Sequence, residues 1–272
     1  MNRGFQMKRL ILVSVFLLIS CGGGGGGDSS SSSSSSPSTT SYTGVGSTVL
    51  NLDWSTHTNP DGSSHQTTVN NIILQTAPGA TLVPVTYSGD VPTSTAVWFA
   101  YISSVLGGMS SGQIINFSAG SSLIATTALI TASANPPKIV ISVSAGNTPV
   151  PTLQGTLPAG LYNSAYKSGV IIVGALGTDG NIASWSATAG AAADRFVIAD
   201  ATCTGTVYSG TSCSAPRVAG YAAIIKQKFP NATSDQIASA ILNTAVLKSG
   251  WDPAIYGKGL VDITAALKYL GS

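Results

Sequence analysis

Continuous apolar runs separated by helical stretches constrain the fold of this chain more than any other feature. Ile139-Val140-Ile141 and Val170-Ile171-Ile172-Val173 contain no polar residue, which is typical of strands buried on both faces of a parallel sheet. Alternation of such strands with helices predicts an α/β fold in three layers (α/β/α), with a mostly parallel central sheet and a ligand site at the carboxyl ends of the strands. We expect strands at Thr48–Trp54, Thr81–Tyr87, Gln113–Ser118, Lys138–Ser144, Val170–Leu176 and Arg195–Ala201, and helices near residues 65–75, 93–106, 122–134, 212–229, 233–247 and 262–270.

The first 20 residues have the pattern of an export signal. Arg3, Lys8 and Arg9 precede an apolar run, Leu10 to Ile19, which is shorter than the roughly 20 residues that span a bilayer. Leu18-Ile19-Ser20-Cys21 also resembles a bacterial lipobox. This resemblance implies cleavage before Cys21 and lipidation of its thiol.

Residues 21–46 are expected to form a lipidated tether, because Gly22–Gly27 and Ser29–Ser36 are tracts that cannot bury a core. The random-coil reach of the tether is on the order of 25 Å. Residues 47–272 would then form one folded domain held at a membrane. We expect a bacterial envelope location, on the outer membrane or cell surface rather than the inner membrane, since Gly22 after Cys21 does not indicate retention at the inner membrane.

The charged residues exclude several classes of function. Three of the 12 basic residues lie in the signal, which leaves nine against ten acidic ones, so a nucleic-acid partner is not expected. All ten acidic residues are Asp, which excludes zinc peptidases that use a Glu base. With only His57 and His65 a His-rich metal centre is not expected, and the scattered Asp residues form no calcium-site pattern. We therefore predict no cofactor.

The segment from Gly210 to Gly220, GTSCSAPRVAG, places a hydroxyl among small residues directly before an apolar helix. Ser212 would lie at the positive end of the helix dipole, although a serine there can also be a simple N-cap. The segment resembles the nucleophile segment of the subtilisin-like serine proteases (subtilases). This resemblance implies a subtilisin-like fold and peptide-bond hydrolysis, with Ser212 as the nucleophile and a protein or peptide as substrate.

A serine nucleophile needs a base, and the base needs an orienting group. His65 begins a predicted helix, and the downstream Ala77–Val85 resembles the strand that follows the histidine of subtilases, so we favour His65 as the base. His57 lies in a polar loop, where a solvated side chain is expected.

Two aspartates compete for the orienting role. Asp53 ends an apolar run that resembles the first strand of subtilases, whereas Asp61-Gly62 after Pro60 favours a turn. We therefore favour Asp53. The order Asp53, His65, Ser212 is the order in subtilisin.

Two further segments resemble subtilase segments that contact substrate. Asn147 follows the run from Ile139 to Gly146 and would donate its side-chain amide to the oxyanion, although an Asn after a Gly is also a common turn residue. Asn116–Gly120 resembles the segment that pairs with extended substrate by strand addition. The resemblance implies substrate contacts at Ser118, Ala119, Gly120, Ser144, Ala145 and Gly146.

The resemblance weakens around the base. Trp54-Ser55 follows Asp53 where subtilases have Ser/Thr-Gly, and Gln66 and Thr68 replace a Gly and a His. A displacement of about 1 Å in a catalytic group costs about 10²-fold in rate. The alternative hypothesis is therefore a degenerate subtilase that binds a peptide or a partner without cleaving it.

The remaining cysteines, Cys203 and Cys213, leave two states open. Export permits a disulfide between them. We favour free thiols, because a small buried thiol packs well beside the nucleophile.

Overall fold

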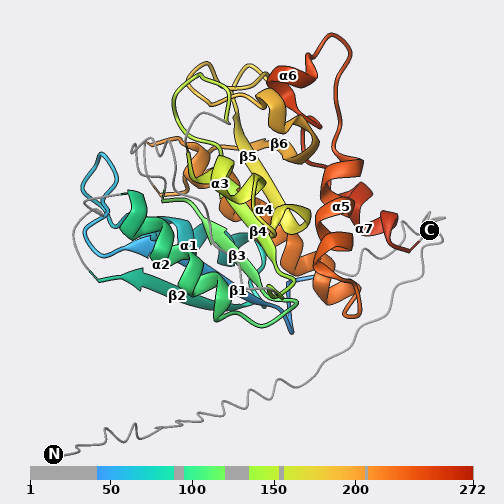
Figure 1. Cartoon of the computed structure of the whole chain (residues 1–272). Coiled ribbons are helices and arrows are strands. Elements are labelled where there is room, and N and C mark those ends of the chain that lie inside the picture. The colour runs from blue at the N-terminus through green and yellow to red at the C-terminus, as the bar shows by residue number, and fades with distance from the viewer. Residues whose placement is uncertain (1–41, 89–94, 120–134, 153–155, 206–207, 272) are drawn as a thin grey trace, which may run out of the picture. The chain divides into compact units, whose positions relative to one another are not determined.

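Six parallel strands form one sheet in the computed structural model, which describes residues 42–88, 95–119, 135–152, 156–205 and 208–271 (Figure 1). The sheet order is β2-β1-β3-β4-β5-β6, and each neighbouring pair is parallel. All six predicted strands are confirmed, with ends that move by no more than two residues. The strands are β1 (Thr48–Trp54), β2 (Thr81–Tyr87), β3 (Ile114–Phe117), β4 (Val140–Ser144), β5 (Val170–Leu176) and β6 (Phe196–Asp200).

Helices cover both faces of this sheet, which confirms the three-layer α/β/α arrangement (Figure 1). They are α1 (His65–Thr76), α2 (Thr95–Gly107), α3 (Leu157–Tyr162), α4 (Thr211–Lys228), α5 (Ser234–Thr244), α6 (Pro253–Tyr256) and α7 (Ile263–Tyr269), with short 3-10 turns at Lys167–Gly169 and Gly190–Arg195. The helix predicted near residues 122–134 lies outside the described residues. Among the helices described, none combines the length and the apolar character needed to cross a membrane.

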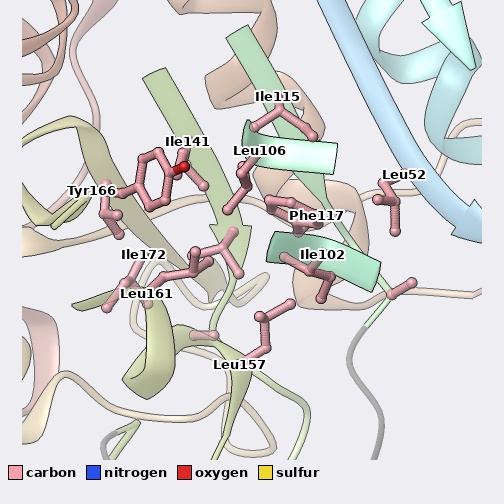
Figure 2. Packing of buried hydrophobic residues seen from close by; sticks show 14 of the residues in the cluster. Leu52, Ile102, Leu106, Ile115, Phe117, Ile141, Leu157, Leu161, Tyr166 and Ile172 are labelled. Atoms are coloured by element: carbon pink, nitrogen blue, oxygen red, sulfur yellow. The ribbon is translucent and has the colours of Figure 1, made fainter. Parts of the chain in front are cut away.

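Successive strand residues face opposite layers, so each strand contributes to two hydrophobic clusters. In β3, Ile115 and Phe117 pack with residues of α2 and α3 (Figure 2), whereas Ile114 packs with residues of α1, α4 and α5. In β5, Ile172 and Ile171 divide in the same way. This explains why β3, β4 and β5 are rich in apolar residues, since both faces of these central strands are covered, whereas the edge strand β2 is largely exposed.

Helix α4 is the buried central helix of the fold, and 13 of its 18 residues are buried. Two hydroxyls fix it against the sheet: Ser142 Oγ donates to Ala215 O at 2.8 Å, and Ser214 Oγ donates to Ala199 O at 3.0 Å. On the side that faces α1, a Cβ at Gly220 would lie 2.6 Å from Cβ of Thr76. Gly220 is therefore required for the close approach of the two helices.

The strand order reverses between β1 and β3, because the chain continues from β1 to β2 on one side and later adds β3 on the other. Ligand sites in open α/β sheets lie at the carboxyl ends of strands at such a reversal. Leu52 of β1 pairs with Phe117 of β3, so the next residues along the two strands, Asp53 and Ser118, lie at this point. The topology therefore places the expected ligand site at the loops after β1 and β3.

Candidate active site

Asp53 and His65 form a buried pair at the junction of β1 and α1. The Nδ1 atom of His65 lies 2.6 Å from Oδ2 of Asp53, and their side chains are 4% and 1% exposed. His65 is the first residue of α1, whose start is fixed by Ser64, because the Ser64 hydroxyl accepts from the Thr67 amide. The end of a strand and the start of a helix thus hold the two groups in contact.

The Asp53 carboxylate is ionised in this environment. Burial raises its pKa, but hydrogen bonds and charge interactions with His57 and His65 outweigh burial and lower the pKa below its ordinary value of 3.8. The Trp54 amide also donates to Oδ1 of Asp53 at 2.9 Å. An ionised carboxylate only accepts hydrogen bonds, so the His65 Nδ1 atom must carry the proton. The Nε2 atom of a neutral His65 is then free to act as a base.

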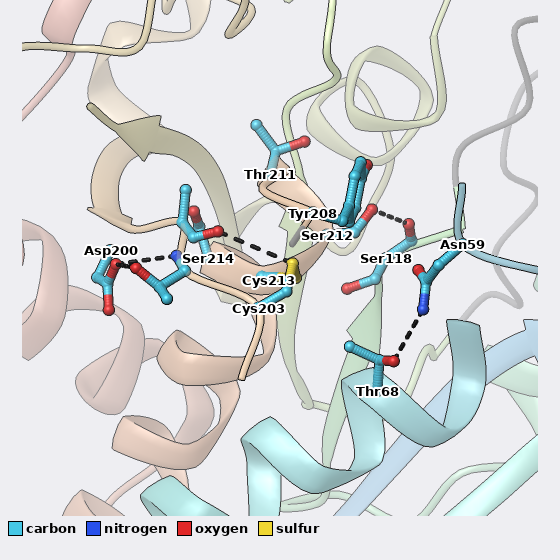
Figure 3. Close-up of a disulfide and its surroundings, with 12 residues drawn as sticks. Asn59, Thr68, Ser118, Asp200, Cys203, Tyr208, Thr211, Ser212, Cys213 and Ser214 are labelled. Carbon is cyan, nitrogen blue, oxygen red and sulfur yellow. Dashed lines mark hydrogen bonds between the residues drawn. A yellow bond between two sulfur atoms is a disulfide. The ribbon is translucent and has the colours of Figure 1, made fainter. Parts of the chain in front are cut away.

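Ser212 lies in the first turn of α4, beside the loop that follows β3 (Figure 3). Its hydroxyl donates to the backbone oxygen of Ser118 at 2.8 Å. Within the described parts of the chain, no hydrogen bond joins Ser212 to either histidine, so the hydroxyl must rotate before a base can take its proton. Catalytic contacts often form only in the substrate complex. The Ser212 amide has no partner within the helix, because the first four N–H groups of a helix have none.

Asn147, in the loop after β4, presents an amide N–H group beside the start of α4. Its Oδ1 atom accepts from both N and Oγ1 of Thr211 at 2.9 Å. A backbone N–H can only donate, so the amide oxygen must face Thr211 and the NH₂ group must face away from it. One N–H donates to the Tyr208 hydroxyl at 3.0 Å. The structure thus holds Asn147 next to the residue that precedes Ser212.

The other predicted substrate-contact residues lie at the carboxyl ends of β3 and β4, except Gly120, which lies outside the described residues. Ser118 and Ala119 are buried directly after β3, and Ser144 ends β4. The Ala145 amide donates to Val173 O at 2.9 Å, and the Gly146 amide donates to Thr211 Oγ1 at 3.2 Å. Ala145 and Gly146 therefore brace the Asn147 loop, and their contact with substrate stays a prediction.

The expectation of a solvated His57 is wrong. His57 Nδ1 lies 2.7 Å from Oδ1 of Asp53, and the side chain is only 22% exposed. The loop after β1 turns back on itself, because the His57 amide donates to Trp54 O and the His65 amide donates to His57 O. The sequence gives no local pattern that predicts this turn of the loop towards Asp53. Asp61 forms the expected turn, in which its carboxylate accepts from the Ser63 amide at 3.0 Å.

The preference for free thiols is also wrong, because Cys203 and Cys213 form a disulfide (Figure 3). Their Cα atoms lie 5.3 Å apart, within the range that a disulfide requires. An antiparallel bridge between Thr202 and Ser209 returns the loop after β6 to the start of α4. That return brings Cys203 to Cys213, and the sequence alone does not reveal it.

The residues that depart from the subtilase pattern brace the base. Gln66 Nε2 donates to Val85 O at 3.3 Å, and its Oε1 accepts from Thr86 Oγ1 at 3.0 Å, which ties α1 to β2. Thr68 Oγ1 accepts from Asn59 Nδ2 at 2.8 Å, which ties α1 to the loop after β1 (Figure 3). These substitutions therefore support the position of α1.

Known proteins resemble this chain over much of its length. The model of the subtilase family matches residues 43–259. A thermostable alkaline protease of Halalkalibacterium halodurans is 37% identical over 55% of this chain and 40% of its own length. Subtilisin E of Bacillus subtilis is 34% identical over 77% of this chain and 58% of its own length, and the subtilisin of Bacillus pumilus is 34% identical over 77% and 80%. The chain thus spans about half the length of several curated relatives.

Solved structures show the same fold. A protease of Pseudoalteromonas arctica superposes with a TM-score of 0.58 at 22% identity, over 84% of this chain and 91% of that one. The prenylagaramide maturation protease PagA superposes with a TM-score of 0.61 at 21% identity, over 84% and 94%. At these identities the likeness concerns the fold alone.

Proposed function

The chain belongs to the subtilase family, and we propose that it is a serine endopeptidase that hydrolyses peptide bonds of proteins or peptides. One observation carries the proposal: the buried, ionised carboxylate of Asp53 accepts the Nδ1–H of His65, with 2.6 Å between Nδ1 and Oδ2. This is the arrangement that makes a histidine a base for a serine hydroxyl.

The proposed reaction begins when the Ser212 hydroxyl leaves Ser118 O and turns towards His65. Nε2 of His65 takes the proton while Ser212 Oγ bonds to the substrate carbonyl carbon, and Asp53 stabilises the resulting imidazolium. The oxyanion accepts two hydrogen bonds, one from the Ser212 backbone N–H and one from the second N–H of the Asn147 side chain. These donors take the place of the water molecules that would solvate the oxyanion in solution. The intermediate then collapses, the C–N bond breaks and His65 gives its proton to the leaving amine. His65 next takes a proton from a water molecule, whose oxygen displaces Ser212 from the acyl group and regenerates its hydroxyl. All these groups belong to the chain itself, so the proposal requires no cofactor.

A fluorophosphonate probe tests the nucleophile directly, because it bonds to an activated serine. We expect the purified full-length protein to be labelled and Ser212→Ala to remain unlabelled. Ser209→Ala, which alters an exposed hydroxyl in the same loop, should be labelled like the wild type. An unlabelled wild-type protein would favour the alternative, a subtilase fold that binds a peptide or partner without cleaving it.

Casein cleavage tests the choice of base. His65→Ala should abolish cleavage to the level of Ser212→Ala, because the variant lacks the imidazole proposed to take the hydroxyl proton. His57→Ala should retain measurable cleavage. If His57→Ala is inactive and His65→Ala is active, the two roles must be exchanged.

We further propose that Cys21 carries a lipid and anchors the enzyme in the bacterial envelope, on the outer membrane or cell surface. The support is the pattern of residues 1–46 described above, all of which except 42–46 lie outside the described residues. Incorporation of labelled palmitate into the wild type, and its loss in Cys21→Ala, is the expected result. Equal incorporation into both proteins would remove the anchor from the proposal.

A further inference from the structure

Two histidines share the single carboxylate of Asp53. His65 Nδ1 lies 2.6 Å from Oδ2, and His57 Nδ1 lies 2.7 Å from Oδ1. Because the ionised carboxylate only accepts, both Nδ1 atoms must donate their protons to it. The Trp54 amide adds a second donor to Oδ1 at 2.9 Å. Each carboxylate oxygen is therefore satisfied, and the carboxylate cannot turn without breaking a hydrogen bond in a buried site.

The His57 ring also covers the base from the side. It stacks on the His65 ring with centroids 3.7 Å apart and an interplanar angle of 28°. Its other face stacks on Trp54 at 4.0 Å and 13°. Trp54 is buried and packs edge-on against Trp98, with ring centroids 5.9 Å apart. The core therefore fixes the Trp54 end of the stack. The three rings thus form a column that ends on His65, and rotation of the His65 ring would break its contact with His57.

The ligand atoms of Asp53, His57 and His65 lie within 4.8 Å of one another, which raises the question of a metal site. A metal needs unprotonated nitrogens whose lone pairs converge at about 2.0–2.1 Å from one point. Here both Nδ1 atoms donate protons to different oxygens, and the stacked rings are inclined by only 28°. The arrangement fits two donors that share one acceptor.

We propose that His57 is a positioning residue of the catalytic set, which fixes the Asp53 carboxylate by its Nδ1–H and the His65 ring by stacking. This inference rests on the proposed protease function. His57 acts through Asp53 and His65, so its loss should lower kcat and leave KM nearly unchanged. Misplacement of a catalytic group by about 1 Å costs about 10²-fold in rate, which sets the upper limit of the expected effect.

Two substitutions separate the hydrogen bond from the stack. His57→Asn keeps an N–H donor at the same number of bonds from Cβ and loses the ring, whereas His57→Phe keeps a ring and loses the donor. A third variant, His57→Ala, loses both the donor and the ring, and we expect it to lower kcat for a peptide p-nitroanilide by about 10- to 100-fold. His57→Asn and His57→Phe should each lower kcat by less. Thr56→Ala, on the same loop and exposed, serves as the control and should match the wild type.

The outcomes distinguish this inference from the proposed function. If the wild type reacts with a fluorophosphonate but all three His57 variants keep the wild-type kcat, only the role of His57 is overturned. A rise in KM without a fall in kcat would also overturn it, since it would place His57 against the substrate. If the wild type does not react, the protease proposal itself fails.

Proton NMR gives a readout that does not depend on turnover. An imidazole N–H that donates to a buried carboxylate gives a signal at low field, so Ser212→Ala protein should show two such signals. His57→Phe in the same background should show one. A single signal in the Ser212→Ala protein would overturn the shared carboxylate even if the His57 variants fail to fold.

Discussion

The disulfide between Cys203 and Cys213 ties the loop after β6 to the first turn of α4, where Ser212 lies. Its contribution to stability can be calculated and measured. It closes a loop with a sequence separation of 10, and removal of the cross-link returns the corresponding chain entropy to the unfolded state. The chain-entropy relation gives about 9 cal/mol/K for this loop, or about 2.7 kcal/mol at 25 °C. A domain of about 230 residues has an unfolding entropy of about 0.5 kcal/mol/K, so the expected fall in melting temperature is about 5–6 °C.

Thermal unfolding followed by circular dichroism measures this difference. The double variant Cys203→Ala, Cys213→Ala is compared with the parent protein, and both carry Ser212→Ala to prevent self-cleavage. The parent should lose the same few degrees when a reductant is added, and the double variant should not respond to it. If the parent and the double variant unfold at the same temperature, with or without reductant, the bond does not constrain the loop and the reasoning is refuted.

Three other predictions follow from the site and the core. The pKa of Asp53 is lower in the folded protein than its ordinary 3.8, so its contribution to stability is present above pH 3.8 and is lost as the pH falls through the folded pKa. Acid titration of the free energy of unfolding should show this loss, and Asp53→Asn should remove that part of the slope. Asn147→Ala should lower kcat about 10²- to 10³-fold with little change in KM, and an unchanged kcat would exclude the oxyanion role. Gly220→Ala should cost about 1–3 kcal/mol in urea unfolding, because its Cβ would overlap Thr76; a neutral result would mean that α1 and α4 can separate freely.

The central strands of the sheet were predictable because their residues are buried on both faces and are therefore almost all apolar. A run such as Val170-Ile171-Ile172-Val173 has one stable environment, between two helical layers, so its composition alone defines it. Helix α5 was predictable for a local reason, since Thr233 and Gln236 form a capping box at its start. By contrast, α3 is only six residues long and contains Gly160, which disfavours a helix interior, while its Leu157 and Leu161 are buried in the core cluster.

In the candidate site, the sequence predicted the groups that lie at element ends but not the groups that depend on loop paths. Asp53, His65 and Ser212 lie at the end of a strand or the start of a helix, where a local pattern gives their place. His57 and Cys203 reach the site only because two loops turn back, after β1 and after β6. No periodicity in the sequence indicates that a loop will turn back. The path of each loop depends on hydrogen bonds between residues whose pairing the sequence pattern does not predict.

The anchor of the Ser212 hydroxyl on Ser118 has a consequence for the order of folding. Asp53 and His65 are 12 residues apart, so they can meet as soon as β1 and α1 form, whereas Ser212 and Ser118 are 94 residues apart. Contacts between distant segments of a parallel sheet form late, because the chain must first close a long loop. A chain still emerging from synthesis or export therefore has its base but not its nucleophile in place. The proposed peptidase site is therefore complete only after the last third of the sequence has packed against the first.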